Sequence, residues 1–192
     1  MQTLVVATGN PGKVAEMETY LAGYVEHLEL KPAELEIEET GTTFLENACL
    51  KASQVALALN QWAIADDSGL TVATLNGAPG LHSARYGRTD QERIDKVLGA
   101  LGNNPERRAV FICALALARP DGVIACQSEG LCQGEILKAP LGTGGFGYDS
   151  IFWVPTEQMS FAQMPAELKH QVSHRGDAFR NLLAQWPTEP RD

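Results

Sequence analysis

Apolar and polar positions along this chain fall into blocks that predict strands and helices in turn. Apolar residues at 2–7 predict a buried strand, and a polar loop containing two glycines follows at 8–13. A helical pattern then runs from Val14 to Leu21. Residues 25–37 alternate apolar with acidic positions, which predicts extended structure. The chain is therefore expected to open with a strand, a loop, a helix and a second extended segment.

Three further helices are predicted from capping signals and apolar periodicity. A Thr-x-x-Glu capping box at 43–46 starts a helix whose apolar face holds Leu45, Ala48, Ala52, Val55, Ala56 and Leu59. The same signal at 89–92 starts a helix that extends to about Leu101. Residues 173–186 predict an amphipathic helix, with Ala178, Phe179, Leu182, Leu183 and Trp186 facing inward.

The remaining apolar runs predict strands. Residues 62–66 form a short strand that ends in an Asp-Asp-Ser-Gly turn, and 70–75 predict the next strand. Residues 108–118 and 123–133 are rich in β-forming residues and are joined by a Pro-Asp-Gly turn, which predicts a hairpin. Strand–helix alternation followed by a hairpin predicts an α/β fold with a mixed β-sheet flanked by helices.

Composition sets limits on what the chain does. At 192 residues it fits one domain, 1–192, with or without two lobes, and 44% hydrophobic content is ordinary for a globular protein. The formal charge of −9 argues against nucleic acid as the main partner, because a phosphate backbone requires a basic surface. A free nucleotide is compatible with this charge, since a few basic residues and a metal ion can neutralise a triphosphate locally.

The cysteines and the apolar segments predict a cellular compartment. Cys49, Cys113, Cys126 and Cys132 contain no C-x-x-C pair and lie in apolar stretches, as expected for buried thiols in a reducing environment. The apolar run near the N-terminus is too short for a signal peptide, and no segment is long enough to span a bilayer. A cytoplasmic protein without a membrane partner is expected.

Two acidic segments carry the strongest chemical signal. Asp66 and Asp67 follow a predicted strand, and carboxylates at a strand's carboxyl end commonly hold Mg²⁺, which in turn holds phosphates. Glu38 and Glu39 end the preceding extended segment, so the two pairs are expected to converge on one cation. Each segment also has a plainer interpretation: a polar turn for 66–69, and acids that favour the following helix dipole for Glu38 and Glu39.

The loop Thr8–Lys13 predicts an anion site. A loop between a strand and a helix N-terminus offers backbone N–H groups and the positive end of the helix dipole, and Lys13 adds a charge. The spacing is not that of a Walker A loop, because two residues separate the glycines and Val14 follows the lysine. A structural turn capped by Asn10 is the alternative interpretation.

Two later segments offer groups for a nucleobase. A glycine-dense loop at 142–149, which leads into a strand at 151–154, surrounds Phe146 with glycines, as expected for a ring that stacks on a base. A hairpin with a core phenylalanine is the alternative. Ser173-His174-Arg175 at a helix start, preceded by Lys169, places donors that suit a carbonyl or a phosphate. Ser173 alone would be read as an N-cap.

Taken together, these segments resemble the inosine triphosphate pyrophosphatase family over almost the whole chain, from Ala7 to Arg175. The resemblance rests on ordered motifs at compatible spacing: Ala7–Lys13, Glu38–Gly41 with Thr43-Phe44 and Glu46–Ala48, Ile64–Leu70, Pro79-Gly80, Ser83–Tyr86, Gly142–Asp149 and Ser173–Arg175. It implies hydrolysis of XTP, ITP or dITP to the monophosphate and pyrophosphate. It also implies a homodimer with an elongated mixed sheet and two lobes around a central cleft.

The resemblance further implies a role for each matching residue. Glu38 and Asp67 would ligate Mg²⁺, and Asp67 would be the catalytic residue that activates water. The triphosphate would be cradled by Thr8, Gly9, Asn10, Pro11, Gly12 and Lys13. The other substrate-binding residues would be Ser68, Phe146, Gly147, Tyr148, Asp149, Lys169, His174 and Arg175. Lys51 matches a family lysine that approaches the phosphates.

Base selection follows from hydrogen-bond chemistry. Hypoxanthine and xanthine present a 6-keto acceptor, whereas adenine presents a donor, so a donor from His174 or Arg175 is satisfied only by the keto bases. Guanine shares this edge and must be rejected at its 2-amino group. Two rival readings are the same chemistry on another damaged nucleotide, and a nucleotide-sensing module that binds without turnover.

Overall fold

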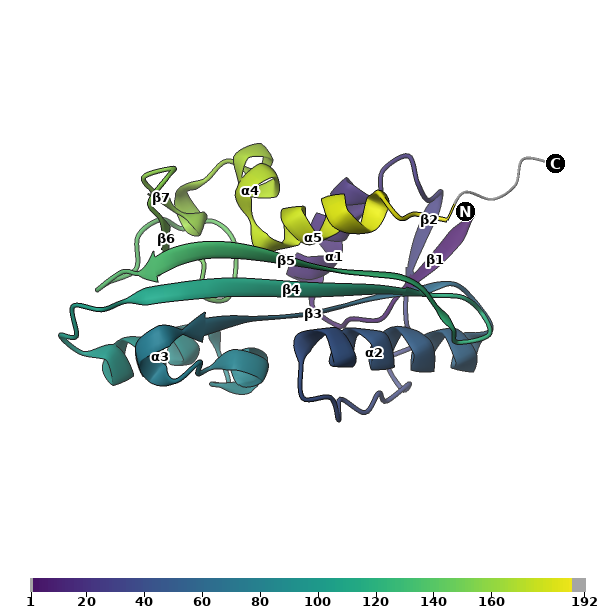
Figure 1. Ribbon diagram of the computed structural model, residues 1–192, viewed down its shortest axis with the longest axis horizontal. Helices are drawn as coiled ribbons and strands as arrows, with labels where there is room; N and C mark the ends of the chain where they lie inside the picture. Colours follow the sequence, from purple (N-terminus) through teal and green to yellow (C-terminus); the bar gives the residue numbers. More distant parts are fainter. Residues whose placement is uncertain (1, 188–192) are drawn as a thin grey trace. The chain divides into compact units, whose positions relative to one another are not determined.

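Seven strands form one mixed sheet flanked by helices in the computed structural model, which describes residues 2–187 (Figure 1). The sheet order is β2-β1-β3-β4-β5-β6-β7. The strands are β1 (Thr3–Val6), β2 (His27–Leu30), β3 (Ala63–Val72), β4 (Arg108–Ala118), β5 (Ile124–Ile136), β6 (Phe152–Val154) and β7 (Met159–Ser160). The helices are α1 (Pro11–Tyr20), α2 (Phe44–Leu59), α3 (Asp90–Leu101), α4 (Ala166–Val172) and α5 (His174–Leu183), with short 3₁₀ turns η1 (Ala73–Leu75), η2 (Gly80–Arg85) and η3 (Phe161–Gln163). The predicted α/β fold is confirmed.

The chain divides into two compact units. The first comprises the chain up to Asp67, residues 113–130 and the chain from Ala178 onward, and the second comprises 68–112 and 131–177. Strands β3, β4 and β5 contribute residues to both units. The expectation of one domain with two lobes stays a prediction.

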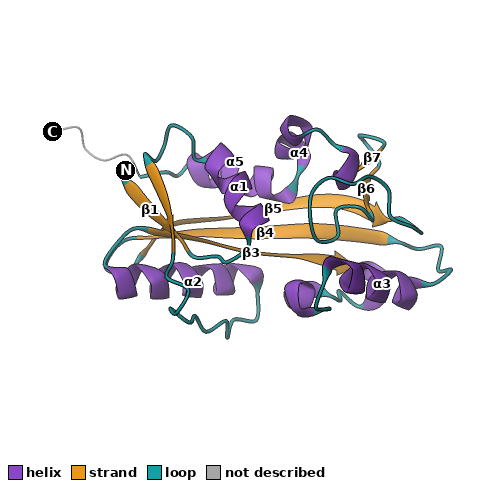
Figure 2. Cartoon of the chain, turned by 180° about the vertical axis from the view of Figure 1, so that it is seen from behind, coloured by secondary structure: helices purple, strands orange, loops and turns teal. Residues whose placement is uncertain are grey.

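In the first unit, β1 pairs in parallel with β2 and β3, and helices cover both faces of these strands. Helix α2 lies on one face, and α1 and the second half of α5 lie on the other (Figures 1 and 2). The α1/α5 face is closed by a cluster in which Met17, Ile64 and Phe179 are fully buried. The Tyr20 ring stacks on Phe179 at 4.6 Å between centroids.

The α2 face is packed differently because its strand positions are small. Ala63 and Ala65 alternate with Ile64 along β3, so they point to the opposite face, toward α2. Helix α2 meets them with Ala48, Ala52 and Val55, none of which is exposed. Small residues on both sides let the helix backbone approach the sheet closely, which brings the polar side chains of α2 near β3.

The second unit has its own aromatic core. Phe111, Phe152 and Phe161 pack with ring centroids 4.6 to 5.7 Å apart, and α3 adds apolar side chains to the same cluster. Strands β5, β6 and β7 pair antiparallel in this part of the sheet. The glycine-dense loop Gly142–Asp149 reaches this core through Tyr148, which is buried.

One element contradicts the sequence prediction in a way that matters for the site. The predicted turn at 66–69 does not exist: β3 runs without interruption from Ala63 to Val72. Turn propensity was outweighed because both aspartates find lysine partners, and because the residues on either side are buried in the sheet. The acidic pair therefore sits inside a strand, not after one.

Other boundaries differ by smaller amounts. The first helix begins at Pro11, not Val14, because Asn10 caps it and proline suits the first helical position. The strand predicted for 70–75 ends at Val72 and continues as η1. Helix α4 and strand β7 were not predicted, and both are too short to show a clear period. The predicted hairpin is confirmed, with its turn closed by Gly122 N–H donating to the Arg119 carbonyl at 2.8 Å.

The prediction of buried thiols is confirmed for three cysteines and wrong for Cys49, which is partly buried. All four are free thiols, and three of them are buried. Burial raises the pKa of Cys126 to about 11 and that of Cys132 to about 12, so neither is a thiolate at neutral pH. None of the described helices is long and apolar enough to cross a bilayer.

Candidate active site

The two carboxylates on β3 point to opposite faces of the sheet. Asp66 has the parity of Ile64 and faces α1, where its Oδ1 lies 2.8 Å from Lys13 Nζ. Asp66 is fully buried, and the thiol of Cys113 on β4 lies 3.9 Å from its Oδ2. Asp66 therefore presents its carboxylate to α1, on the other face of the sheet from α2.

Asp67 faces α2 and is held there at both carboxylate oxygens. Lys51 Nζ donates to its Oδ1 at 3.1 Å, and Asn47 Nδ2 donates to its Oδ2 at 3.3 Å. Asn47 and Lys51 are one helical turn apart, so a single face of α2 supplies both donors. The orientation of the Asp67 carboxylate is therefore fixed by two side chains of one rigid helix.

Glu39 joins the same network. Its Oε1 accepts from Lys51 Nζ at 3.0 Å, so one ammonium group bridges the carboxylates of Glu39 and Asp67. The acidic segment before α2 and the acid on β3 are thus brought together, as predicted, with a lysine between them. Sequence reasoning chose Glu38 as the acid at this position, whereas the structure gives the direct link to Glu39.

The pKa values in this network shift for identifiable reasons. Burial raises the pKa of Asp67 above that of an ordinary aspartate, and the Lys51 charge opposes this shift only in part. Burial alone would lower the pKa of Lys51, but the nearby charges of Asp67, Asp66 and Glu39 raise it. The two directions are compatible because Lys51 faces several acids, whereas Asp67 shares its cation with Glu39. Lys51 stays charged, and Asp67 is a stronger proton acceptor than an exposed aspartate.

Glu38 is held through its backbone. Its N–H donates to Gln54 Oε1 at 3.2 Å, and its carbonyl accepts from Gln54 Nε2 at 3.1 Å. Within the part of the chain that the structure describes, the Glu38 carboxylate makes no hydrogen bond or ion pair. This carboxylate keeps all its lone pairs available for a ligand.

The donor set suits a hard cation such as Mg²⁺. Residues 2–187 contain no group of three or more His, Cys, Asp or Glu side chains arranged to hold a metal. Mg²⁺ does not require such a cage, because it uses one or two carboxylates and fills its other positions with water and phosphate oxygens. The carboxylates of Glu38, Glu39 and Asp67 provide oxygen ligands of this kind, and Lys51 already occupies the position of a cation beside two of them.

The loop Thr8–Lys13 satisfies its own backbone. Asn10 is the N-cap of α1, and its Oδ1 accepts from the N–H groups of Gly12 and Lys13 at 2.9 and 3.4 Å. The N–H of Asn10 donates to Thr8 Oγ1 at 3.2 Å. The structural turn capped by Asn10 is therefore real. A phosphate at this helix end would have to replace these bonds, of which the one to Lys13 is long and weak.

The second unit holds the aromatic loop with a buried ion pair. Asp149 Oδ2 accepts from Lys169 Nζ at 2.7 Å and from the Phe146 N–H at 2.9 Å, and both ion-pair side chains are at most 10% exposed. A Cβ atom at Gly145 would collide with the Asp149 carboxylate, so only glycine fits this turn. Lys169 Nζ also lies 5.0 Å from the centroid of the Phe146 ring.

The start of α5 brings two more predicted residues to this loop. Arg175 is 2% exposed, its Nη2 donates to Ser68 Oγ at 3.1 Å, and its guanidinium carbon lies 6.0 Å from the Phe146 ring centroid. His174 stacks on Phe111 at 4.6 Å with an interplanar angle of 9°. Ser173 is an N-cap as expected, because its Oγ accepts from the Gly176 N–H. Lys169 and Arg175 therefore lie beside the Phe146 ring, and Arg175 also bonds Ser68.

Two residues that position this loop were missed by sequence reasoning. Asp90, at the start of α3, accepts from the Gly147 N–H at 2.8 Å. Ser83 accepts from the Tyr148 hydroxyl at its carbonyl, also at 2.8 Å. The Tyr148 ring is thus part of the core, and a substrate contact at this residue would come from its backbone. No local signal marks Asp90 as a loop anchor, since its position also fits a simple acid in a first helical turn.

The carboxylate network and the contacts of Arg175 each include a residue of β3, and these two residues are neighbours in the chain. Asp67 ends the first unit on β3, and Ser68 begins the second.

A comparison with protein families identifies the group to which the chain is related. The model of the Ham1 family matches residues 4–185. The chain belongs to the Ham1 family. This match confirms the resemblance drawn from the motifs, and it covers all the residues described above.

Individual relatives agree with the family match. A dITP/XTP pyrophosphatase from Synechocystis sp. is 61% identical over 187 residues, covering 97% of this chain and 96% of that protein. A dITP/XTP pyrophosphatase from Nostoc sp. is 62% identical over 180 residues, covering 94% of this chain and 92% of that protein. The structure of a HAM1 protein from Coxiella burnetii superposes with a TM-score of 0.86 at 41% identity, covering 96% of this chain and 98% of that one.

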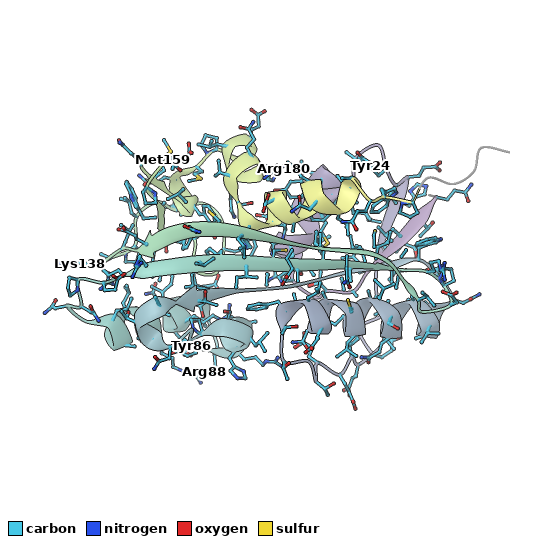
Figure 3. All side chains as sticks on the ribbon, viewed as in Figure 1. Tyr24, Tyr86, Arg88, Lys138, Met159 and Arg180 are labelled. Atoms are coloured by element: carbon cyan, nitrogen blue, oxygen red, sulfur yellow. The ribbon has the colours of Figure 1, made fainter. Side chains whose placement is uncertain are left out.

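The buried pair in the aromatic loop generates a stability prediction. Asp149→Asn removes the carboxylate charge that pairs with the buried Lys169 ammonium at 2.7 Å, which should lower the free energy of unfolding by about 3 kcal/mol. Urea denaturation followed by circular dichroism measures the change. Glu92→Gln is the matched control, because Glu92 pairs with Arg88 at 2.9 Å but at the surface, where Arg88 is 90% exposed (Figure 3). The control should show no measurable loss; equal losses would mean that burial does not set the strength of these pairs.

Proposed function

We propose that this protein hydrolyses non-canonical purine nucleoside triphosphates, namely XTP, ITP and dITP, to the monophosphate and pyrophosphate. Water adds to the α-phosphorus, the bond between this phosphorus and the α–β bridging oxygen breaks, and pyrophosphate leaves. Membership of the Ham1 family and the dITP/XTP pyrophosphatase relatives support this function. The observation that carries it is Asp67, a partly buried carboxylate on β3 that accepts hydrogen bonds at both oxygens from side chains of α2.

The first unit supplies the phosphate chemistry. Glu38 and Asp67, the ligand pair that the family resemblance implies, would hold Mg²⁺, and the ion would neutralise the triphosphate charge when bound. Lys13 adds a positive charge at the N-terminus of α1. This charge also acts on Asp67, where it partly opposes the rise in pKa that burial causes. Asp67 accepts the proton of the attacking water, and Lys51 and Asn47 keep its carboxylate aimed while it does so.

The second unit supplies base recognition. The Phe146 ring offers an apolar face for stacking, and Lys169 and Arg175 surround it with donors. Because these side chains are cationic and only donate, they suit the 6-keto oxygen of hypoxanthine or xanthine and not the amino group of adenine. His174 is stacked on Phe111, so its ring orientation is fixed before any ligand binds.

Expectations about cellular location and oligomeric state complete the proposal. A cytoplasmic location is supported by four free thiols, which persist in a reducing compartment. A homodimer is implied by the family resemblance and is open to a direct measurement of molecular mass in solution.

A panel of triphosphates tests the reaction. ITP, dITP and XTP should be hydrolysed with kcat/KM values orders of magnitude above those of ATP and GTP, and the phosphorus product should be pyrophosphate without orthophosphate. Comparable rates for all five nucleotides would contradict the substrate assignment. Binding without any pyrophosphate would instead support the sensing module.

Asp67→Asn tests the proton acceptor. The amide cannot take a proton from water, so kcat should fall by about 10²- to 10⁴-fold, with the circular dichroism spectrum unchanged. Near-normal turnover would refute the role of Asp67. Asp121→Asn is the matched control, because Asp121 is an exposed aspartate in the β4–β5 turn and should leave kcat as it is.

Arg175→Ala tests base selection. Loss of a donor aimed at the 6-position should reduce kcat/KM for ITP more than for ATP, so the ratio of the two should fall. Equal losses for both would assign Arg175 to phosphate binding or to structure. Arg180→Ala is the control, because Arg180 is an exposed arginine on the same helix (Figure 3) and should change neither value.

A further inference from the structure

Helix α2 meets the segment Glu38–Gly41 through a series of side-chain bonds. This segment contains no helix or strand of its own. Gln54 bonds both backbone groups of Glu38, at 3.2 and 3.1 Å. Lys51 bonds the Glu39 carboxylate at 3.0 Å, and Asn47 Oδ1 accepts from the Gly41 N–H at 2.8 Å. The order along the helix is the reverse of the order along the segment.

The spacing of these contacts is matched on the two sides. Asn47, Lys51 and Gln54 lie at i, i+4 and i+7, which places them along one face of a helix. Seven residues of helix span about 10 Å, and three residues of extended chain also span about 10 Å. An extended segment running antiparallel to α2 therefore meets all three side chains without distortion.

The contacts at the two ends of this segment are made by primary amides. Gln54 presents a carbonyl oxygen and an N–H group to the Glu38 backbone, in the way that a neighbouring strand would. Asn47 Oδ1 accepts from the Gly41 N–H, and Asn47 Nδ2 donates to the Asp67 carboxylate, so Asn47 links the segment to β3 as well. A Cβ atom at Gly41 would lie 2.7 Å from Asn47 Oδ1, so the close approach requires glycine.

We propose that Gln54 is a positioning residue for the metal-binding carboxylates: it fixes the Glu38 backbone on α2, the same helix that fixes Asp67. Gln54 contacts neither Asp67 nor the substrate-binding residues in this role, and it acts through Glu38 alone. The inference rests on the proposed function, in which Glu38 and Asp67 hold the cation. Residues that orient metal ligands typically change metal affinity by about 10- to 100-fold when they are removed.

Direct binding of Mn²⁺, used as a paramagnetic probe for the Mg²⁺ site, tests this inference. Gln54→Met keeps the length of the side chain but removes both bonds to Glu38. We expect the Kd for Mn²⁺, measured on the whole protein by electron paramagnetic resonance, to rise about 10-fold. Gln91→Met is the matched control, because Gln91 is also a helix glutamine but bonds to Asp95 on α3; its Kd should equal that of the wild type.

A kinetic measurement separates positioning from general damage. In Gln54→Met, the Mg²⁺ concentration that gives half-maximal turnover should rise by a similar factor, while kcat at saturating Mg²⁺ returns close to the wild-type value. A purely structural role would lower kcat at every Mg²⁺ concentration. Gly41→Ala keeps Gln54 but forces the other end of the segment away from Asn47, and it should also weaken Mn²⁺ binding even if Gln54→Met folds poorly.

The outcomes distinguish this inference from the proposed function. If Glu38→Gln weakens Mn²⁺ binding while Gln54→Met and Gly41→Ala bind it as the wild type does, the positioning role is overturned and the metal site stands. If the wild type does not bind Mn²⁺, or if Glu38→Gln and Asp67→Asn bind it normally, the proposed metal site fails and the positioning role fails with it.

Discussion

Two adjacent carboxylates in the middle of a buried strand impose the main constraint on this structure. Asp66 and Asp67 lie inside β3, and strand alternation sends them to opposite faces. An unpaired charge in such a position would cost several kcal/mol, so each face must supply a cation. Helix α1 supplies Lys13 on one side, and α2 supplies Lys51 on the other. The placement of both helices against β3 is therefore tied to charge neutralisation as well as to apolar packing.

The ion pairs that neutralise the two carboxylates also give them different environments. Asp66 is fully buried and committed to Lys13, which suits a structural and electrostatic role. Asp67 is less buried, shares Lys51 with Glu39, and has a raised pKa because desolvation outweighs the lysine. A proton acceptor works best when its pKa is closer to the operating pH than that of a free aspartate. Two chemically identical neighbours thus acquire different partners and different burial from the faces that they occupy.

Local signals in the sequence predicted those parts of the fold that local chemistry determines. The capping signals fixed the starts of α2 and α3, where the Thr43 and Thr89 hydroxyl oxygens accept from the N–H groups of Glu46 and Glu92; the reciprocal bond that completes a capping box is present at α2. The turn predicted at 66–69 failed because its outcome depends on Lys13 and Lys51, which are distant in sequence. The motifs identified most of the candidate site, including Glu38, Asp67, Phe146 and Arg175. They could not identify Gln54, because the sequence does not show that this side chain packs against the backbone of Glu38.

The contacts of Glu38 explain why an amide side chain, that of Gln54, holds it on α2 and a charged side chain does not. A lysine in place of Gln54 could hold Glu38 through its carboxylate, as Lys51 holds Glu39, but it would then compete with any cation for the same oxygens. Gln54 bonds only the backbone, so the segment is fixed while the carboxylate keeps its full capacity to accept. One face of α2 therefore contacts the two neighbouring glutamates differently: Lys51 pairs with the Glu39 carboxylate, whereas Gln54 bonds only the Glu38 backbone. This difference follows from the donor chemistry of the two α2 side chains, because an ammonium group pairs with a carboxylate, whereas an amide donates to a carbonyl and accepts from an N–H group.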